Sequence, residues 1–424
     1  MLLFKNVTTL FGENLYVAVD GAFIKSVSHE RPAGEFEREI DCAGKLMLPG
    51  FYNTHTHAAM TLFRGYGEDL PLQRWLTERI FPAEEKLTAK AVYDASMLAI
   101  AEMISGGTVA FTDMYMFPEE TARAVAETGI KANLCRPIIS FDPSESIKDS
   151  PRMAEAIALF KEWHNACGGR IKIDMSLHAE YTNTERSCRE VAECAKELGT
   201  GMHIHLSETK TEHQECKARR GGCTPARFMY DCGVLDVPTT AAHCVWLEDD
   251  DLPLLREKGV TVAHNPVSNL KLGSGVMPYR KYRDAGINVA LGTDGAASNN
   301  TLDIQKEMYV AALIHKGVNL APDSVTAADV IESATVCGAR AQGRLDCGKI
   351  SEGYRADLIL IDATTINNIP SYDPAYTTVY SANRSDVCLT MVDGKILYEN
   401  GEFLTLDIEK VKAEMRYTCE HYFD

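Results

Sequence analysis

The first feature with chemical meaning is a pair of histidines, His55 and His57, two positions apart in the stretch from Pro49 to His57. On a β-strand, alternate side chains leave the same face, so we expect both imidazoles to point in one direction. Two neutral imidazoles that converge in this way suit a Zn²⁺ or Fe²⁺ ion. The spacing alone does not decide between a metal site and two strand histidines with a structural role.

A second group of candidates lies in the stretch from Met202 to Glu208. His205 ends an apolar run and could supply a third imidazole. His203 lies on the same strand face but deeper, where we expect it to be structural or to support the ligands. Glu208 is near enough to reach the same cavity without binding the metal, and a carboxylate there can transfer protons. The alternative for Glu208 is an exposed glutamate at the start of a helix.

Two more apolar runs end in a polar residue, at His243 and at Asp294. His243 could hold an attacking water, and Asp294 could be the last metal ligand and take a proton from that water. Three imidazoles and one carboxylate leave a coordination position open, as a catalytic zinc site requires. A single aspartate before a glycine is more often a turn residue, but four strand ends that supply one ligand set favour a metal site.

These residues end apolar runs that alternate with helical stretches through the middle of the chain. The stretch from Thr88 to Ser105 has helical spacing and stops at two glycines, and another helix begins at Thr326 with the spacing of a capping box. Eight alternations in about 300 residues favour a closed (β/α)₈ TIM-type barrel of the α/β class over an open sheet. The eight runs end at His57, Asp113, Arg136, His178, His205, His243, His264 and Asp294.

The position of these polar residues is itself an indication of function. In a (β/α)₈ barrel, the carboxyl ends of the strands carry the active site, whereas the opposite end serves stability. No G-x-G-x-x-G follows any of the apolar runs, so a dinucleotide site is not expected.

The two ends of the chain resemble each other and differ from the middle. Short alternating apolar runs are broken by Asp20-Gly21 near one end and by Asp393-Gly394 near the other. An Asp-Gly pair between such runs is typical of a β-hairpin. We therefore predict that residues 1–50 and 350–424 form one composite β-sandwich domain and that residues 51–349 form the metal-dependent catalytic barrel.

The composition disfavours several classes of function. The 424 residues include 60 acidic and 43 basic side chains, and the net charge of −17 disfavours nucleic acids and anionic membranes as partners. No apolar run approaches the roughly 18–20 residues of a membrane span, and no leader is expected. The 13 cysteines are scattered without a C-x-x-C pair, so they predict neither a disulfide framework nor a thiolate zinc site. The expected location is cytoplasmic.

Longer stretches resemble the amidohydrolase superfamily and, within it, the 5′-methylthioadenosine/S-adenosylhomocysteine deaminases. The H-x-H and T-D-G elements are common to the superfamily, whereas AHNPVSNLKLGSG and FPAEEKLT are more specific to its nucleoside and heterocycle deaminases. The resemblance covers residues 49–300, and the β segments at both ends fit the same architecture. The matching stretches are PGFYNTHTHAAMTLFRG, FPAEEKLT, HLSE, AAHC, AHNPVSNLKLGSG and LGTDGAASNN.

The resemblance implies one divalent metal ion, Zn²⁺ in the first place and Fe²⁺ as the alternative. Members with two metals carry a lysine at the end of the fourth strand. Here the fourth run, Arg170 to Leu177, ends without a lysine, so a single ion is expected. The ligands that the resemblance implies are His55, His57, His205 and Asp294.

The resemblance also implies roles in catalysis and in substrate binding. Glu208 would transfer protons, and His243 and Asp294 would act on the water. Glu84 would accept from the two ribose hydroxyls, because one carboxylate can accept two hydrogen bonds. Without the resemblance, Glu84 is better explained as a solvated residue and Trp75 as a core residue. Together with Glu208, the further pocket residues that the resemblance implies are Trp75, Arg136 and His178.

One departure from the family pattern concerns the 5′ substituent of the substrate. Members that use S-adenosylhomocysteine resemble each other in a second arginine, shortly after the one that matches Arg136, for the amino-acid carboxylate. In this chain only Lys148 or Arg152 could substitute for it. An ammonium group cannot make the bidentate contact of a guanidinium. The departure favours a methylthio, 5′-deoxy or unmodified adenosine.

We therefore predict a metal-dependent hydrolytic deaminase, an aminohydrolase of cyclic amidines, that converts an adenine nucleoside into its inosine analogue and ammonia. One alternative is an aminohydrolase or chlorohydrolase of another heterocycle, of the triazine, cytosine or guanine type, because barrel loops decide the substrate. Another is an inactive barrel that acts as a binding protein. The expected partner is a small purine nucleoside, and the sequence leaves open whether the chain forms a homo-oligomer.

Overall fold

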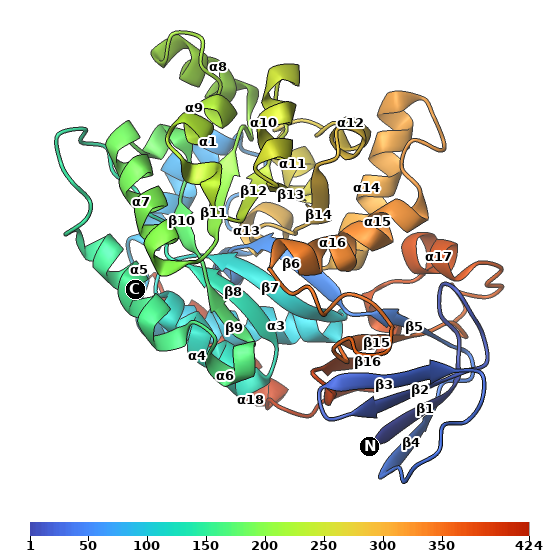
Figure 1. Ribbon diagram of the computed structural model, residues 1–424. Coiled ribbons are helices and arrows are strands. Elements are labelled where there is room, and N and C mark those ends of the chain that lie inside the picture. Colours follow the sequence, from blue (N-terminus) through green and yellow to red (C-terminus); the bar gives the residue numbers. More distant parts are fainter. Residues whose placement is uncertain (424) are drawn as a thin grey trace.

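The computed structural model describes residues 1–423, and its centre is a barrel of parallel strands (Figure 1). The barrel strands are β6 (Phe51–Thr56), β7 (Thr108–Met114), β8 (Lys131–Cys135), β9 (Ile171–Ile173), β10 (Met175–Leu177), β11 (Met202–Leu206), β12 (Thr239–His243), β13 (Thr261–His264) and β14 (Asn288–Leu291). Strands β6 to β9 form one sheet and β10 to β14 another, with parallel neighbours throughout. The α/β barrel prediction is confirmed.

Two junctions close the barrel. Strand β14 returns to β6, where Thr54 Oγ1 donates to the Leu291 carbonyl at 2.8 Å and the Asp294 amide donates to the His55 carbonyl at 2.9 Å. At the other junction, β9 pairs with β8 and β10 pairs with β11, so the fourth strand is interrupted at Asp174. We predicted one uninterrupted run there, but the two short strands occupy a single strand position.

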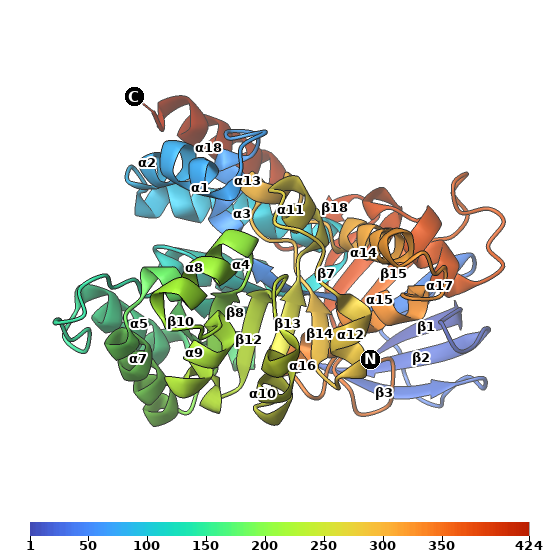
Figure 2. The ribbon, with the colours of Figure 1, turned by 90° about the horizontal axis from the view of Figure 1, so that it is seen from above.

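Helices follow the strands and cover the outside of the barrel (Figure 2). The Thr88 side chain caps α3 by accepting from the Ala91 amide at 3.2 Å, and Gly107, with φ +84°, follows the helix end. The predicted start at Thr326 is also confirmed, as the N-cap of α15. The main helices are α3 (Ala89–Ser105), α4 (Pro118–Thr128), α5 (Pro151–Trp163), α7 (Glu185–Leu198), α8 (Lys210–Arg219), α9 (Pro225–Asp231), α10 (Leu252–Glu257), α11 (Pro266–Lys271), α12 (Tyr279–Asp284), α14 (Ile304–Asn319), α15 (Ala327–Ala334) and α16 (Val336–Ala341). Within residues 1–423, no helix has the length and apolarity needed to cross a membrane.

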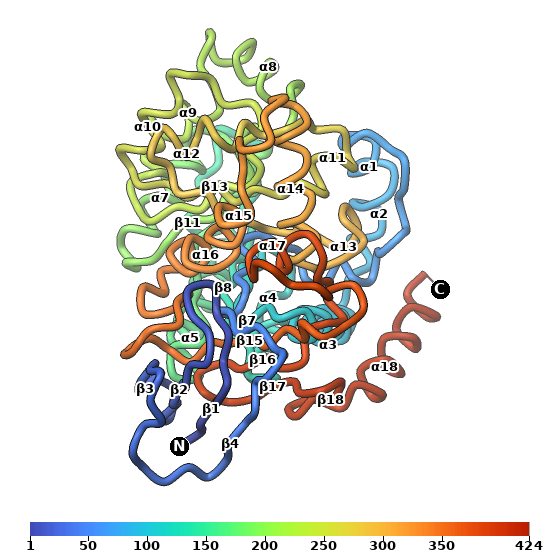
Figure 3. The backbone as a smooth tube through the Cα atoms, turned by 90° about the vertical axis from the view of Figure 1, so that its right-hand side faces the viewer, coloured from blue at the N-terminus to red at the C-terminus, as the bar shows by residue number. Residues whose placement is uncertain are grey.

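The two ends of the chain form two further sheets beside the barrel (Figures 1 and 3). Their strands are β1 (Leu2–Val7), β2 (Leu15–Asp20), β3 (Phe23–Ser28) and β4 (Arg38–Asp41) in one sheet, and β5 (Lys45–Pro49), β15 (Leu358–Asp362), β16 (Val387–Val392), β17 (Lys395–Glu399) and β18 (Glu402–Phe403) in the other. Phe4 and Val17 of the first sheet share a buried apolar cluster with Leu358 and Met391 of the second. The two ends of the chain therefore pack together through this cluster.

The last helix, α18 (Ile408–His421), leaves these sheets and packs against α3 (Figure 2). Its Met415 belongs to one buried cluster with Trp75, Ile80 and Ala83. These three residues lie in the segment between β6 and α3, which contains α1 (Leu72–Trp75), a π-helical turn (Leu76–Ile80) and α2 (Phe81–Glu84). The C-terminal helix thus supports a segment that carries two of the predicted substrate residues.

Candidate active site

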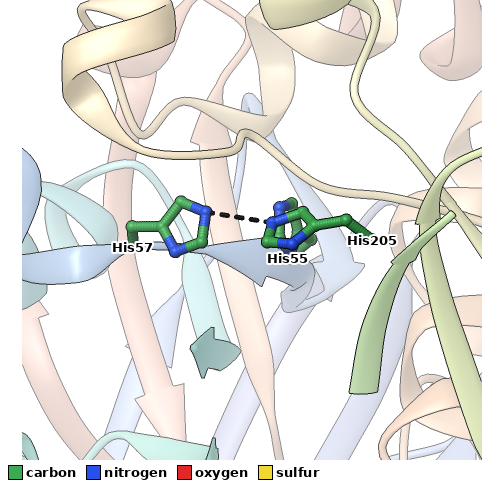
Figure 4. A group of neighbouring side chains, drawn as sticks. All are labelled: His55, His57 and His205. Carbon is green, nitrogen blue, oxygen red and sulfur yellow. Dashed lines mark hydrogen bonds between the residues drawn. The ribbon is translucent and has the colours of Figure 1, made fainter. Parts of the chain in front are cut away.

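Three imidazoles meet at the carboxyl ends of β6 and β11, as the spacing of the histidines predicted (Figure 4). His55 lies in β6, His57 directly follows that strand, and His205 lies in β11. One ring nitrogen of each residue lies within 4.8 Å of those of the other two. The period-two alternation of β6 places His55 and His57 on one face, and the parallel neighbours bring His205 to the same end of the barrel.

Hydrogen bonds at the Nδ1 atoms determine which nitrogen faces the centre. The Nδ1 of His57 is 2.6 Å from the Met114 carbonyl, and the Nδ1 of His205 is 2.7 Å from the His178 carbonyl. Because a carbonyl oxygen only accepts, both Nδ1 atoms carry the proton and both Nε2 atoms present lone pairs. Metal-binding histidines have this arrangement, in which the second nitrogen is fixed by an acceptor behind it.

The Nδ1 of the third imidazole, His55, faces a side chain instead of a backbone carbonyl, and this side chain is His203. Its Nε2 lies 2.8 Å from the Nδ1 of His55, on the side away from the centre. Burial lowers the pKa of His55 to about 3 and holds the pKa values of His203 and His205 well below their usual range. His55 and His205 are therefore neutral at pH 7, as metal ligands must be, and their neighbour His203 is neutral as well.

The geometry of the cluster fits a divalent cation. The Nε2 atoms of His57 and His205 lie 3.3 Å apart, although the tautomers above leave no proton between them. The Oδ1 of Asp294 is 3.3 Å from the Nε2 of His57 and 3.4 Å from the Nε2 of His55, and the latter atom has no hydrogen-bond partner among residues 1–423. Lone pairs that face one another in a buried site are stabilised by a positive ion, and this mixed imidazole and carboxylate set suits Zn²⁺.

The turn after β14 orients Asp294. Its backbone is left-handed, with φ +63°. Ser268 Oγ and Ser298 Oγ donate to its Oδ2 at 2.6 and 2.8 Å, and the Gly295 amide donates to its Oδ1 at 2.8 Å. The two serines hold one oxygen, so the other faces the imidazoles.

Glu208 and His243 lie beside the cluster. Ser274 Oγ donates to Glu208 Oε1 at 3.2 Å, and Glu208 Oε2 lies 3.9 Å from the Nε2 of His243. Burial raises the pKa of Glu208. Burial works against protonation of His243, but the charges of Glu208 and Asp294 outweigh it and raise the pKa of His243. The Nδ1 of His243 is 2.8 Å from Asn269 Oδ1 and donates to it, which leaves Nε2 directed at Glu208.

A cavity of about 180 Å³ opens over these residues. The apolar side chains of Leu72, Leu76 and Ile80 form part of its wall. All four residues that we expected to bind substrate alongside Glu208 line this cavity: Trp75, Glu84, Arg136 and His178. The structure therefore brings together residues from α1, α2 and the ends of β8 and β10.

Trp75 and Glu84 each place a polar group in a part of the cavity wall that is largely apolar. Trp75 is 4% exposed, and its Nε1 has no hydrogen-bond partner among the described residues. The Tyr115 hydroxyl donates to Glu84 Oε1 at 2.8 Å, while burial raises the pKa of Glu84 to about 7. A ligand with hydroxyl groups can stabilise the ionised form of Glu84 by donating hydrogen bonds to it.

The structure separates the two proposed substitutes for a second arginine. Lys148 does not line the cavity, because its ammonium group pairs with Glu193 at 3.0 Å on the surface. Arg152, near the start of α5, lines the cavity and donates to the Ile139 carbonyl at 3.1 Å. Arg136 also lines it and pairs with Glu155 at 2.8 Å. The cavity thus has two guanidinium groups, and of the two candidates, Lys148 or Arg152, the arginine is the one that lines it.

Several residues of the site were not singled out from the sequence. Ser268, Asn269 and Ser274 belong to the AHNPVSNLKLGSG block, so their place in a distinctive motif was a usable signal. Tyr115 follows the run that ends at Asp113 and could have been noticed in the same way. The Met114 carbonyl has no counterpart in the sequence pattern, because every residue has a carbonyl.

Comparison with known proteins agrees with this geometry. The family model described as the amidohydrolase family matches residues 46–397. The chain belongs to the amidohydrolase family. It is 48% identical over 381 residues to a 5-methylthioadenosine/S-adenosylhomocysteine deaminase of Acetivibrio thermocellus, with 90% of this chain and 87% of that protein covered. It is 45% identical over 381 residues to a 5′-deoxyadenosine deaminase of Methanosarcina mazei, with the same coverage of 90% and 87%.

A solved structure of the same fold extends the comparison. The crystal structure of an adenosine deaminase from Xanthomonas campestris with bound zinc has a TM-score of 0.93 and 31% sequence identity to this amidohydrolase. The match covers 100% of this chain and 98% of the other. The likeness therefore extends over the barrel and the terminal sheets together.

Proposed function

We propose that this amidohydrolase is a hydrolytic deaminase of adenine nucleosides, which releases ammonia and the corresponding inosine analogue. The observation that carries the proposal is the position of Glu84, a carboxylate that accepts hydrogen bonds, in the same cavity as the histidine and aspartate cluster. A ribose diol needs such an acceptor, whereas a free heterocycle does not. The names of the relatives, which are deaminases of adenine nucleosides, support the assignment.

We propose that one divalent ion, Zn²⁺ in the first place, is held by His55, His57, His205 and Asp294. When bound, such an ion acts as a Lewis acid and makes water nucleophilic near neutral pH. The fixed Nδ1 protons and the facing Nε2 atoms support this ligand set. The zinc in the adenosine deaminase of Xanthomonas campestris supports the identity of the ion.

The protein side chains move the protons of the reaction. His243 and Asp294 orient the attacking water toward carbon 6 of the purine, and Asp294 takes one of its protons. Glu208, which burial favours in the protonated form, donates a proton to the adjacent ring nitrogen and so makes carbon 6 electrophilic. The water oxygen then bonds to carbon 6. The proton held by Asp294 passes to the exocyclic amine, and the carbon–nitrogen bond breaks with release of ammonia. Glu208 takes back the hydroxyl proton as the carbonyl forms at carbon 6.

The remaining cavity residues bind and orient the nucleoside. Glu84 accepts from the two ribose hydroxyls, and the Tyr115 hydroxyl holds its carboxylate in place. Trp75 and His178 complete the pocket around the substrate, and Leu72 and Ile80 exclude water from it. Exclusion of water strengthens each of the polar contacts inside.

The 5′ end of the nucleoside lies toward the guanidinium groups in this proposal. Arg136 and Arg152 both line the cavity, and a guanidinium can bind a carboxylate in a bidentate manner. This removes the main reason for disfavouring S-adenosylhomocysteine, which rested on the missing second arginine. Both methylthioadenosine and S-adenosylhomocysteine are therefore candidate substrates, next to 5′-deoxyadenosine.

The boundaries predicted for the domains are part of the same proposal. We propose that residues 1–50 and 350–424 form a β-sandwich domain and residues 51–349 the catalytic barrel. The apolar cluster shared by the two terminal sheets supports this division. A buried ion pair joins the two parts, since Lys131 of β8 lies 2.6 Å from Asp357 and 2.7 Å from Asp393.

The proposed function is tested by measuring ammonia release from a panel of substrates. The panel contains adenosine, methylthioadenosine, S-adenosylhomocysteine, 5′-deoxyadenosine, guanine, cytosine and an aminotriazine. We expect turnover of the adenine nucleosides alone. Turnover of a free base or a triazine without nucleoside turnover would assign the alternative, a hydrolase of another heterocycle. A metal-loaded protein inactive on every compound would indicate a binding protein.

Replacing Glu84 with alanine is expected to raise KM for the nucleosides by about 10- to 100-fold, because a hydrogen bond to a charged group contributes about 1.5–3 kcal/mol. The value of kcat should fall much less. Steady-state kinetics on adenosine and on 2′,3′-dideoxyadenosine, an adenine nucleoside without the ribose diol, measure this effect, because only adenosine should lose affinity in the variant. An unchanged KM for adenosine in this variant would show that Glu84 does not bind the ribose.

A further inference from the structure

The turn that carries Glu208 is held by a second buried glutamate, Glu212. Three consecutive amides donate to its carboxylate: Ser207 N to Oε1 at 3.0 Å, Glu208 N to Oε2 at 2.7 Å and Thr209 N to Oε2 at 3.4 Å. The backbone of Ser207 is left-handed, with φ +48°. Successive amides in such a turn form a concavity that binds an anion, and here the anion is a side chain of the same chain.

The surroundings of Glu212 show that these amides are what stabilises its charge. The side chain is only 4% exposed, and no lysine or arginine within residues 1–423 forms an ion pair with it. Buried carboxylates without a cation are costly unless hydrogen bonds compensate. Burial and the nearby Glu208 carboxylate raise the pKa of Glu212 to about 7, and the three amide donors act against this rise, so the turn and the carboxylate stabilise each other.

Helix capping alone does not account for this contact. Glu212 is the third residue of α8 and forms a capping box with Thr209, but the amide of this cap residue makes the longest of the three bonds. Within the described residues 1–423, the comparable carboxylate of α15, Asp329, accepts only from its own cap residue, Thr326. Glu212 reaches two residues further back, and its shortest bond is to the amide of Glu208.

We propose that Glu212 is a positioning residue, which fixes the peptide of Glu208 so that the Glu208 side chain faces Ser274 and His243. The proposal rests on the proton-transfer role proposed for Glu208. With the peptide held by Glu212 and one carboxylate oxygen held by Ser274 at 3.2 Å, the other oxygen is directed toward His243. A proton donor that is displaced by about 1 Å loses much of its effect.

Replacing Glu212 with aspartate separates positioning from capping. Aspartate at this helix position still caps the helix, as Asp329 does in α15, but its shorter side chain does not reach the Glu208 amide. We expect kcat for adenosine to fall about 10- to 100-fold, while KM and metal content stay within about twofold of wild type. Glu212→Gln should lower kcat as well, because its amide group presents a donor to backbone donors.

The matched control is Asp329→Asn, which weakens the capping box of α15, a helix that contributes no residue to the lining of the cavity. It should lower the melting temperature slightly and leave kcat unchanged. If Glu212→Asp and Glu212→Gln retain wild-type kcat, the proposal is overturned. It is also overturned if both variants lose kcat, metal content and melting temperature together, because Glu212 would then be merely structural.

Amide hydrogen exchange tests whether Glu212 holds the turn at residues 207–209, and this test does not rely on turnover. The amides of Ser207 and Glu208 should exchange at least tenfold faster in Glu212→Asp than in wild type, whereas the Thr209 amide, which an aspartate can still hold, should exchange at the wild-type rate. In Asp329→Asn all three amides should exchange at wild-type rates. Unchanged exchange rates of the Ser207 and Glu208 amides in Glu212→Asp would overturn the proposal that Glu212 holds this turn. If wild-type protein releases no ammonia from any nucleoside, the proposed function fails, and the exchange rates still decide whether Glu212 holds the turn.

Discussion

Replacing Glu208 with glutamine is expected to reduce kcat for adenine nucleosides by about 10²- to 10⁴-fold, the usual contribution of a general acid or base. Glutamine has nearly the same size and can still accept from Ser274, so the cavity should keep its shape. It has no transferable carboxyl proton, however, and the ring nitrogen of the purine stays unprotonated. Steady-state kinetics together with metal analysis measure the effect, and metal content should equal that of wild type.

The control for this variant is Glu193→Gln, which changes a surface glutamate paired with Lys148 outside the cavity. Its kinetic constants should match those of wild type. Near-normal activity of Glu208→Gln would refute the proton-transfer role. Loss of metal from the variant would instead identify Glu208 as part of the ligand set.

Removing the metal with a chelator is expected to abolish turnover almost completely and to lower the melting temperature. An ion bound to the folded state alone stabilises it by about 4 kcal/mol at a thousand times its Kd, so its loss is visible in thermal unfolding. Adding Zn²⁺ back should restore both properties. The measurements are ammonia release and a thermal unfolding curve, each recorded before chelation, after chelation and after readdition.

His205→Ala is the matching variant, since it removes one of the facing Nε2 atoms. It should contain little metal and should not recover activity when Zn²⁺ is added. His29→Ala, which removes an exposed histidine near the end of β3, controls for the substitution itself and should behave as wild type. Full activity of the chelated protein would show that the reaction needs no metal.

The convergence of His55, His57 and His205 was predictable because its signals are local. Alternation places His55 and His57 on one strand face, and an apolar run ending in a polar residue marks each strand end. The acceptors behind the imidazoles were not predictable. The carbonyls of Met114 and His178 are backbone groups, and only the pairing of the strands brings them to the Nδ1 atoms.

The residues that line the outer cavity were harder to predict than the histidine and aspartate cluster beneath it. Trp75 and Glu84 gave no signal by themselves, and their positions followed from the family resemblance. Lys148 and Arg152 are four residues apart, yet one pairs with Glu193 on the surface and the other lines the cavity. Helix α5 begins at Pro151, so the start of a helix separates them, and spacing does not reveal which way each side chain turns.

Strand β5 has a consequence for the order in which the protein is made. It leads through Gly50 directly into β6, the strand of His55, but its partner is β15, with Leu46 opposite Ile361. A ribosome that has released β5 must add some 300 further residues before that partner emerges, which takes about 15 to 60 seconds at typical synthesis rates. During this interval, the backbone groups of β5 that later pair with β15 have no strand partner. A nascent chain stopped before β15 therefore exposes an apolar strand edge of the kind that chaperones cover.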